Sequence, residues 1–279
     1  MRSAEETRDT TLAEESWESP QTPETGGPSS GARKGSLLAS KLVRYLTMPL
    51  ILAAVCVGLY LWVGSLELDS IEQRSLNREV ITEKVIRHLE ITAVATLVVV
   101  LLAVTAGVIL TRPVMRKVAP YIAAVASTGQ GVPAIGVLVL SAILLDQFGF
   151  KAAVAALVIY AFLPVLRNTM VGIRQVDPSV IESGRGMGMT KTAVLFQIEL
   201  PLAVPIMLAG IRTALIIVVG TATLATFINA GGMGDIINTG IKTSREPILI
   251  TGSLLTAVLA LGIDYLAGIA EDVLKPRGL

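Results

Sequence analysis

The sequence is poor in the side chains on which most enzymes and metal sites depend. Its 279 residues include one cysteine, one histidine and only 4% aromatic residues. Cys56 lies in an apolar run and has neither a second thiol for an internal disulfide nor an imidazole at metal-ligand spacing. His88, near Glu90 at the edge of another apolar run, lacks a nucleophile or second ligand and is interpreted as an interfacial residue. We therefore expect this chain not to be an enzyme and to hold no metal or cofactor.

Charge is also scarce and nearly balanced. Lys and Arg number 23 and Asp and Glu 22, which gives a net charge of +1, and charged residues make up 16% of the chain. Neither a basic field nor aromatic stacking surfaces are available, so no nucleic acid is expected as a partner. Residues 184–192 come closest to a nucleotide-binding loop, but their lysine does not follow a glycine. The chain is expected not to hydrolyse ATP itself.

Apolar residues, in contrast, are abundant. Hydrophobic residues make up 52% of the chain and the mean hydropathy is +0.68, which indicates a polytopic membrane protein. A helix that crosses about 30 Å of hydrocarbon needs roughly 20 mostly apolar residues. Four runs approach this length: residues 48–64, 91–110, 203–227 and 248–266.

Two further candidate spans are less regular. Residues 118–145 are long enough, but Gly-Gln-Gly-Val-Pro at 129–133 interrupts them. Residues 152–166 are short and contain Pro164. The predicted fold is all-α, with about six transmembrane helices and five as the fallback.

The ends of the chain and its orientation follow from charge and composition. Residues 1–40 are predicted to form a disordered acidic cytoplasmic tail, because acidic and small polar residues predominate there. The tail lacks the pattern of a signal peptide, so the first apolar run is expected to remain as an anchor. With six spans and both termini cytoplasmic, 13 Lys and Arg flank the cytoplasmic side and seven the outside. This bias favours that orientation in the cell membrane.

Residues 176–205, a stretch of mixed polarity between two apolar segments, predict two short helices joined by a turn. Asp177 can cap the first helix and Pro178 suits its first turn. The glycines at positions 184, 186 and 188 are expected to break this helix. A second helix should begin near Lys191, and the prolines at 201 and 205 should bend the chain back toward the membrane.

Seven residues of this stretch match the pattern E-A-A-x3-G-x9-I-x-L-P in spacing, with two conservative replacements. The matching positions are Glu182, Ser183, Gly184, Gly188, Ile198, Leu200 and Pro201. Ser183 and Gly184 replace alanines with residues that are also small. The stretch resembles the EAA loop of ABC-importer permeases; the alternative is a solvated cytoplasmic connector.

The resemblance implies a type I ABC-importer permease in which this loop couples to a cytoplasmic ABC ATPase dimer. The implied coupling residues are the seven motif positions together with Asp177 and Arg185. A carboxylate such as Glu182 can pair with a basic group of the ATPase. ATP and Mg²⁺ would be bound by that partner.

Three other strings are similar to osmoprotectant permeases, which import glycine betaine, carnitine or choline: residues 88–92, 208–214 and 230–235. This similarity implies a second permease subunit, identical or homologous, an external substrate-binding protein and surrounding membrane lipid. The chain then divides into the tail (1–40), a first span with an external loop (41–85), a permease core (86–274) and a cytoplasmic C-terminal tail (275–279).

Candidate residues for the translocation pathway are Gln130, Pro133 and Asn229. Irregular backbone at membrane depth is tolerated where it is buried in protein or lines a water-filled cavity. Alternatively, the nearby glycines only permit close helix packing and Gln130 bonds a neighbouring helix. The glycine-rich string at 230–235 fits a mobile external gate or a tight turn.

Arg212 and Asp264 are the charged residues that fit least well in their apolar runs. They can form an ion pair, or each can reach the membrane interface separately.

Other functions remain open at this point. A permease of another ABC-importer branch, for amino acids or phosphonates, would share the loop and the topology. An ion-coupled secondary transporter would favour inverted repeats, of which the sequence gives no convincing sign. An intramembrane enzyme would need a catalytic set that one histidine and one cysteine hardly supply.

Overall fold

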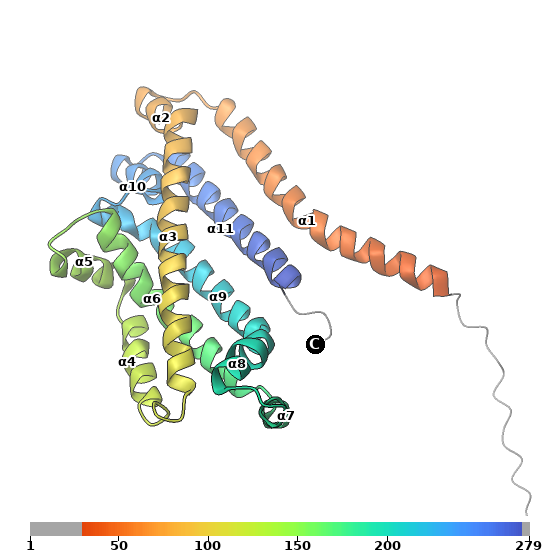
Figure 1. Ribbon diagram of the computed structural model, residues 1–279. Helices are drawn as coiled ribbons and strands as arrows, with labels where there is room; N and C mark the ends of the chain where they lie inside the picture. The colour runs from red at the N-terminus through yellow and green to blue at the C-terminus, as the bar shows by residue number, and fades with distance from the viewer. Residues whose placement is uncertain (1–29, 275–279) are drawn as a thin grey trace, which may run out of the picture. The chain divides into compact units, whose positions relative to one another are not determined.

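The computed structural model describes the backbone of residues 30–274 and the side chains of residues 45–274, and the regular elements in this part are all helical (Figure 1). In chain order they are α1 (Ser30–Gly64), α2 (Ser70–Ser75), α3 (Arg78–Thr111), α4 (Ala119–Gly131), α5 (Ala134–Leu144), α6 (Phe150–Arg174), α7 (Pro178–Gly186), α8 (Lys191–Val194), the π-helix η1 (Leu195–Glu199), α9 (Leu200–Ala222), the 3₁₀-helix η2 (Thr223–Ile228), α10 (Met233–Thr243) and α11 (Glu246–Leu274).

The predicted tails lie mostly outside the described residues. This applies to residues 1–29 and to the C-terminal tail at 275–279. Residues 30–40, for which the composition predicts disorder, instead belong to α1. This segment contains Ala, Leu, Lys and Arg, which all have high helix propensity.

Five helical runs in the described part are long and apolar enough to cross a membrane. They are residues Tyr45–Gly64 of α1, then α3, α6, the continuous run Lys191–Ile228, and α11. The pair α4 and α5 makes a sixth span if its bent halves are counted together. The prediction of six spans with five as the fallback is confirmed, and the chain is a multi-pass membrane protein.

The predicted interruption at residues 129–133 is a sharp bend. The α4 and α5 axes lie 105° apart. Pro133 disfavours a helical conformation of the preceding residue, and Val132 is extended, with φ −82° and ψ 139°. α5 therefore turns away from the direction of α4 (Figure 1).

The candidate span at residues 152–166 is confirmed but is longer than the apolar run, because α6 has 25 residues and continues through Pro164. Pro164 has no N–H to donate to the carbonyl of Tyr160, four residues earlier. The Gln130 side-chain amide donates to that carbonyl instead (3.0 Å). In return, the Tyr160 hydroxyl donates to the Val132 carbonyl at the α4–α5 bend (2.7 Å). Each irregular helix thus satisfies a carbonyl that the other leaves open.

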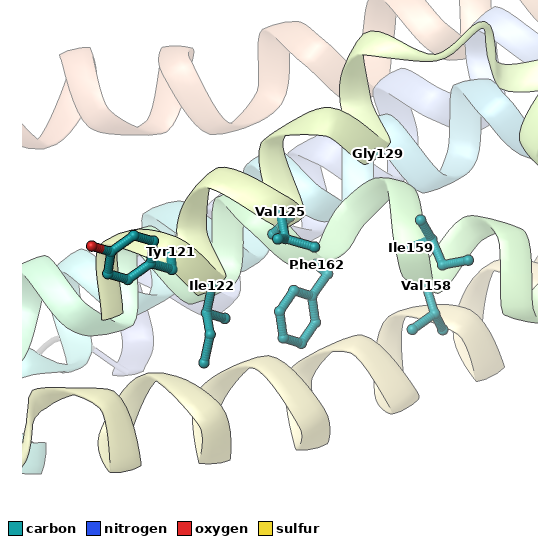
Figure 2. Close-up of a pocket in the computed structure, with 8 residues that line it drawn as sticks. Tyr121, Ile122, Val125, Gly129, Val158, Ile159 and Phe162 are labelled. Atoms are coloured by element: carbon teal, nitrogen blue, oxygen red, sulfur yellow. The ribbon is translucent and has the colours of Figure 1, made fainter. Parts of the chain in front are cut away.

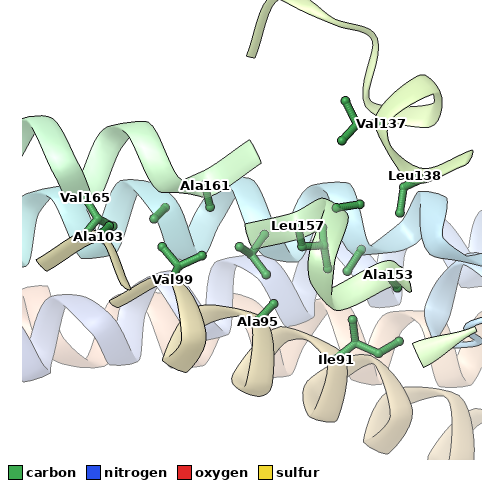
Figure 3. Close-up of a cluster of buried hydrophobic side chains, with 14 of the residues drawn as sticks. Ile91, Ala95, Val99, Ala103, Val137, Leu138, Ala153, Leu157, Ala161 and Val165 are labelled. Carbon is green, nitrogen blue, oxygen red and sulfur yellow. The ribbon is translucent and has the colours of Figure 1, made fainter. Parts of the chain in front are cut away.

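The core lies where α6 packs against both α3 and α9. On α3, Ile91, Ala95, Val99 and Ala103 recur every four residues and are fully buried (Figure 3). Inside a membrane, small side chains allow helices to approach closely and gain van der Waals contact. α6 and α9 approach each other in this way, because a Cβ at Gly210 would lie 2.4 Å from Cβ of Asn168.

This contact leads to a first prediction. We expect Gly210→Ala to lower the thermal unfolding midpoint in detergent, because Asn168 Cβ is fixed to the α6 backbone and the helices must separate. Such overpacking typically costs about 1–3 kcal/mol.

The matched control is Gly220→Ala, also on α9, where an added Cβ meets no atom within 4 Å. This control should keep or raise the midpoint, since alanine has the higher helix propensity by about 1 kcal/mol. Equal midpoints for the two variants would contradict the proposed close contact.

Candidate functional site

The first helix of the predicted loop, α7, begins as expected. The Ser179 backbone N–H donates to the Asp177 carboxylate (2.8 Å), and Pro178 occupies the first turn. This backbone hydrogen bond lowers the pKa of Asp177 below its ordinary value. The expectation that Gly184 breaks the helix is wrong, because α7 continues to Gly186. The chain turns at Gly188, where φ is +89°.

The second helix joins the membrane span without a break. The Thr190 hydroxyl accepts from the Ala193 N–H (3.2 Å) and caps α8, which passes through η1 into α9. The prolines expected to bend the chain do not interrupt it, because helical structure continues through Pro201 and Pro205. The wider π turn of η1 gives room for the Pro201 ring just before it would clash with the preceding turn.

The two arms of the loop pack against each other at Gly184. This residue is buried, and a Cβ there would lie 2.6 Å from Ile198 Cδ1 and 3.3 Å from Met189 Sδ. Val194 is also buried beside it, with 2% of its surface exposed. The motif spacing therefore places a small residue on one arm of the loop against Ile198 on the other arm, and the two arms pack together.

The outer face of the loop is polar and open. Glu182, Ser183 and Arg185 are exposed, and Pro201 is exposed where the second arm enters α9, with Leu200 half-buried beside it. The Ser183 hydroxyl donates back to the Ser179 carbonyl (2.8 Å). Neither Glu182 nor Arg185 has an ion-pair partner among the described residues. This face can therefore accept a charged partner.

An ion pair with a buried carboxylate fixes the base of the loop, and sequence reasoning missed it. Arg112, which caps the end of α3, contacts Glu199 at the end of η1 with 2.6 Å between Nη2 and Oε2. Glu199 is only 8% exposed. The only signal in the sequence was a carboxylate next to the apolar motif residues, which does not identify its partner.

The structure brings Arg212 and Asp264 together. The Arg212 guanidinium donates to both carboxylate oxygens of Asp264, at 2.6 and 2.9 Å, and lies 3.5 Å from Glu271 Oε2. A Cβ at Gly268 would lie 3.4 Å from Arg212 Nη1, so the glycine leaves room for the guanidinium. These contacts tie α9 to α11.

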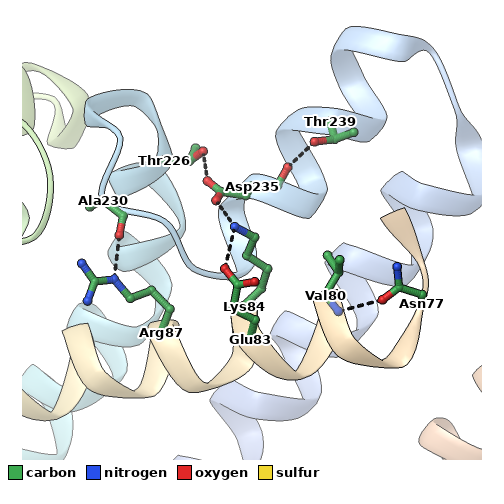
Figure 4. A network of polar contacts seen from close by, with 9 residues as sticks. All are labelled: Asn77, Val80, Glu83, Lys84, Arg87, Thr226, Ala230, Asp235 and Thr239. Carbon is green, nitrogen blue, oxygen red and sulfur yellow. Dashed lines mark hydrogen bonds and ion pairs between the residues drawn. The ribbon is translucent and has the colours of Figure 1, made fainter. Parts of the chain in front are cut away.

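At the opposite end of the helices, a polar network surrounds the glycine-rich turn (Figure 4). Lys84 contacts Asp235 (3.0 Å), and Asp235 also accepts from the Thr226 hydroxyl. Arg87 donates to the Ala230 carbonyl (3.0 Å). A cavity of about 470 Å³ lies beside these residues and is also lined by Asn229, which has a left-handed backbone with φ +60°. The turn is held to α3 and leads into α10.

The sequence suggests that His88 is an interfacial residue, but its side chain is fully buried in the structure. Its Nε2 lies 3.1 Å from the Val219 carbonyl, just before α9 narrows into η2. Where the helix changes to 3₁₀ geometry, the Thr223 N–H donates to the carbonyls of Gly220 and Thr221 instead of the Val219 carbonyl four residues earlier. His88 therefore connects α3 to a carbonyl at the end of α9.

The predicted pathway residues Gln130, Pro133 and Asn229 do not gather at one cavity. Gln130 bonds α6, Pro133 begins α5, and Asn229 lies in the glycine-rich turn. An apolar cavity of about 460 Å³ between α4 and α6 is lined by Ile122, Val125 and Phe162 among others (Figure 2). Gly129, not Gln130, faces this cavity.

With this geometry established, the comparisons with known proteins assign the chain to a family. Residues 103–277 match the binding-protein-dependent transport system inner membrane component. The chain belongs to this family. Membership implies a role in transport, with an ATPase and a binding protein as partners.

Curated relatives of this family member are osmoprotectant permeases by name. The chain is 41% identical over 196 residues to the choline transport system permease protein OpuBB of Bacillus subtilis. The aligned region covers 70% of this chain and 89% of the relative. It is 37% identical over 207 residues to the carnitine transport permease protein OpuCD of Listeria monocytogenes, which covers 74% and 92%.

Solved structures share the fold. A chain of the MetNI methionine ABC transporter in an inward-facing conformation superposes with a TM-score of 0.63 at 22% identity, over 71% of this chain and 98% of that one. A chain of an amino acid ABC transporter gives 0.61 at 19% identity, over 75% and 100%. The predicted ABC-importer permease architecture is confirmed.

The packed turn of the loop leads to a second prediction. We expect Gly184→Leu to speed tryptic cleavage after Lys191 in the purified chain, because the added side chain separates the two arms. Gly184→Ala should be tolerated, since the atoms nearest its Cβ are the ends of flexible side chains.

Gly186→Leu serves as the control, because an added Cβ at Gly186 meets no atom within 4 Å. Cleavage after Lys191 should then follow the native rate. The same rate in Gly184→Leu would show that the arms do not depend on this contact.

Proposed function

We propose that this permease forms half of the translocation pathway of an ATP-driven, binding-protein-dependent importer and receives the ATPase's movement through residues 176–205. The observation that carries the proposal is the open polar face of α7 on a rigid base. Glu182 and Arg185 are exposed there, while Gly184 and Ile198 pack beneath them. A charged group on such a face gains most from a partner with a complementary charge.

Force applied to this loop has a direct route into the membrane. The helical run from Lys191 to Ile228 contains 38 residues without a break. At 1.5 Å per residue it is about 57 Å long, more than the hydrocarbon thickness. A push on α8 would therefore tilt α9 and move η2 at the other end, as a rigid-body motion of packed helices.

The proposed orientation places the loop, both termini and the ATPase dimer on the cytoplasmic side of the cell membrane. The distribution of Lys and Arg supports it. The glycine-rich turn and its polar cavity then face outward, toward the binding protein. A second permease, identical or homologous, would complete the pathway, and ATP with Mg²⁺ would be bound in the ATPase.

For the substrate we propose compatible solutes such as glycine betaine, carnitine or choline. Support comes from the names of relatives at 37–41% identity, which concern choline and carnitine. The likeness to methionine and amino acid transporters lies at 19–22% identity and concerns the fold alone. An amino acid or phosphonate substrate has no comparable support.

A third prediction tests the coupling face. In membrane vesicles that contain the complete system, we expect Glu182→Lys to lower ATP-dependent uptake of labelled choline and glycine betaine by about tenfold or more. The reason is that like charges placed across an interface cost several kcal/mol. ATP hydrolysis stimulated by substrate should fall in parallel.

Glu67→Lys is the matched control, because Glu67 is an exposed carboxylate in the loop after α1, at the end opposite α7. It should retain native uptake, with equal amounts of assembled complex. Undiminished uptake in Glu182→Lys would remove Glu182 from the coupling role. Uptake of methionine but not of these solutes by the native system would overturn the substrate assignment.

A further inference from the structure

A contact between α3 and the base of the loop stands apart from the motif. Glu199 occupies the position between Ile198 and Leu200 at which the EAA pattern specifies no residue. Its carboxylate nevertheless accepts hydrogen bonds from two guanidinium nitrogens of Arg112, at 2.6 and 3.4 Å. A motif search therefore passes over a residue that joins two membrane helices.

Besides its contact with Glu199, the Arg112 side chain is held by hydrogen bonds to its own helix. Its Nε donates to the Val108 carbonyl (3.3 Å) and its Nη2 to the Thr111 hydroxyl (3.0 Å). Both acceptors belong to the last turn of α3, whose C-cap is Arg112 itself. The guanidinium is thus a rigid extension of α3, and little side-chain freedom is lost when it binds a carboxylate.

The carboxylate is held just as firmly on its own side. Glu199 is nearly buried, and the helical hydrogen bonds of η1 and α9 continue on both sides of it. A buried carboxylate without a partner is strongly unfavourable, so the pair resists separation. When Glu199 moves with the loop, Arg112 is drawn with it.

The other contacts between α3 and α9 at this end are apolar. Val104 and Val108 of α3 pack against a small cluster that includes Ala203 and Met207 of α9. Apolar surfaces of this kind can slide past each other, as packed helices do in shear motions. The ion pair is a directional contact that such sliding would break.

We infer that Arg112 and Glu199 are positioning residues that carry movement of the loop into α3 as well as into α9. This inference rests on the proposed function. It adds a second route, so that α3 and α9 move together at the loop end and transport stays matched to ATP hydrolysis. Loss of the pair would leave ATP hydrolysis in place while less solute crosses per ATP.

The test measures solute imported per ATP hydrolysed in proteoliposomes with the complete complex. Glu199→Gln and Arg112→Gln should each lower this ratio about fivefold or more, the low end of measured coupling between sites. The exchange of both charges, Arg112→Glu with Glu199→Arg, should bring the ratio back to within about twofold of native. A purely structural role would change the amount of assembled complex but not the ratio.

Arg245→Gln is the control, because it breaks an ion pair of similar length, Arg245–Asp69 at 2.6 Å, at the opposite end of the helices. Its ratio should equal the native one. Native ratios in both single variants, or a charge exchange no better than they are, would overturn the inference. If Arg112→Gln, which leaves the buried Glu199 carboxylate without its partner, does not assemble, Glu199→Gln decides alone, since the Arg112 side chain that it leaves unpaired is one-third exposed. A native complex without solute-stimulated ATP hydrolysis would instead refute the proposed function.

Discussion

The exchange of hydrogen bonds between Gln130, Tyr160 and the two irregular helices is the contact on which the rest of the bundle depends. Lipid offers no donor to a carbonyl left open by proline, so such a carbonyl must be satisfied within the protein. The Gln130 side-chain amide donates to the carbonyl that Pro164 leaves open, and the Tyr160 hydroxyl donates to the carbonyl at the α4–α5 bend. Because both bonds join the same pair of helices, the bend and the proline-containing span stabilise each other. α6 therefore continues through Pro164 as one helix, which packs against both α3 and α9.

Apolar packing alone would leave the long helices free to slide along each other. Ion pairs at both ends of α3 restrict this sliding. Arg112–Glu199 joins α3 to the base of the loop, and Lys84–Asp235 joins α3 to the turn before α10 at the other end. Charged contacts are directional and costly to break when buried, whereas the hydrophobic effect is not directional. The motions available to the bundle are thus fewer than its smooth core would suggest.

The sequence predicted the features that arise from local chemistry. Hydropathy identified the long spans, and the cap at Asp177 and the motif spacing located both arms of the loop. It did not predict that α6 continues through Pro164 or that His88 is buried, because each depends on a partner far away in the chain: Gln130 for the proline, the Val219 carbonyl for the histidine. Arg112 and Glu199 are 87 residues apart, and nothing in either segment specifies the other.

The same distinction explains what the EAA pattern describes. Its fixed positions include Gly184 and Ile198, which touch, so their spacing is set by the length of the turn between them. The buried part of the pattern therefore reflects internal packing, whereas Glu182, Ser183 and Pro201, which the pattern also specifies, are exposed. Arg185, which is exposed, and the buried position of Glu199 are not specified by the pattern, so they can change with the partner and with the helix that must follow the loop. Differences in coupling among relatives should therefore arise at these positions, while the packed turn stays the same.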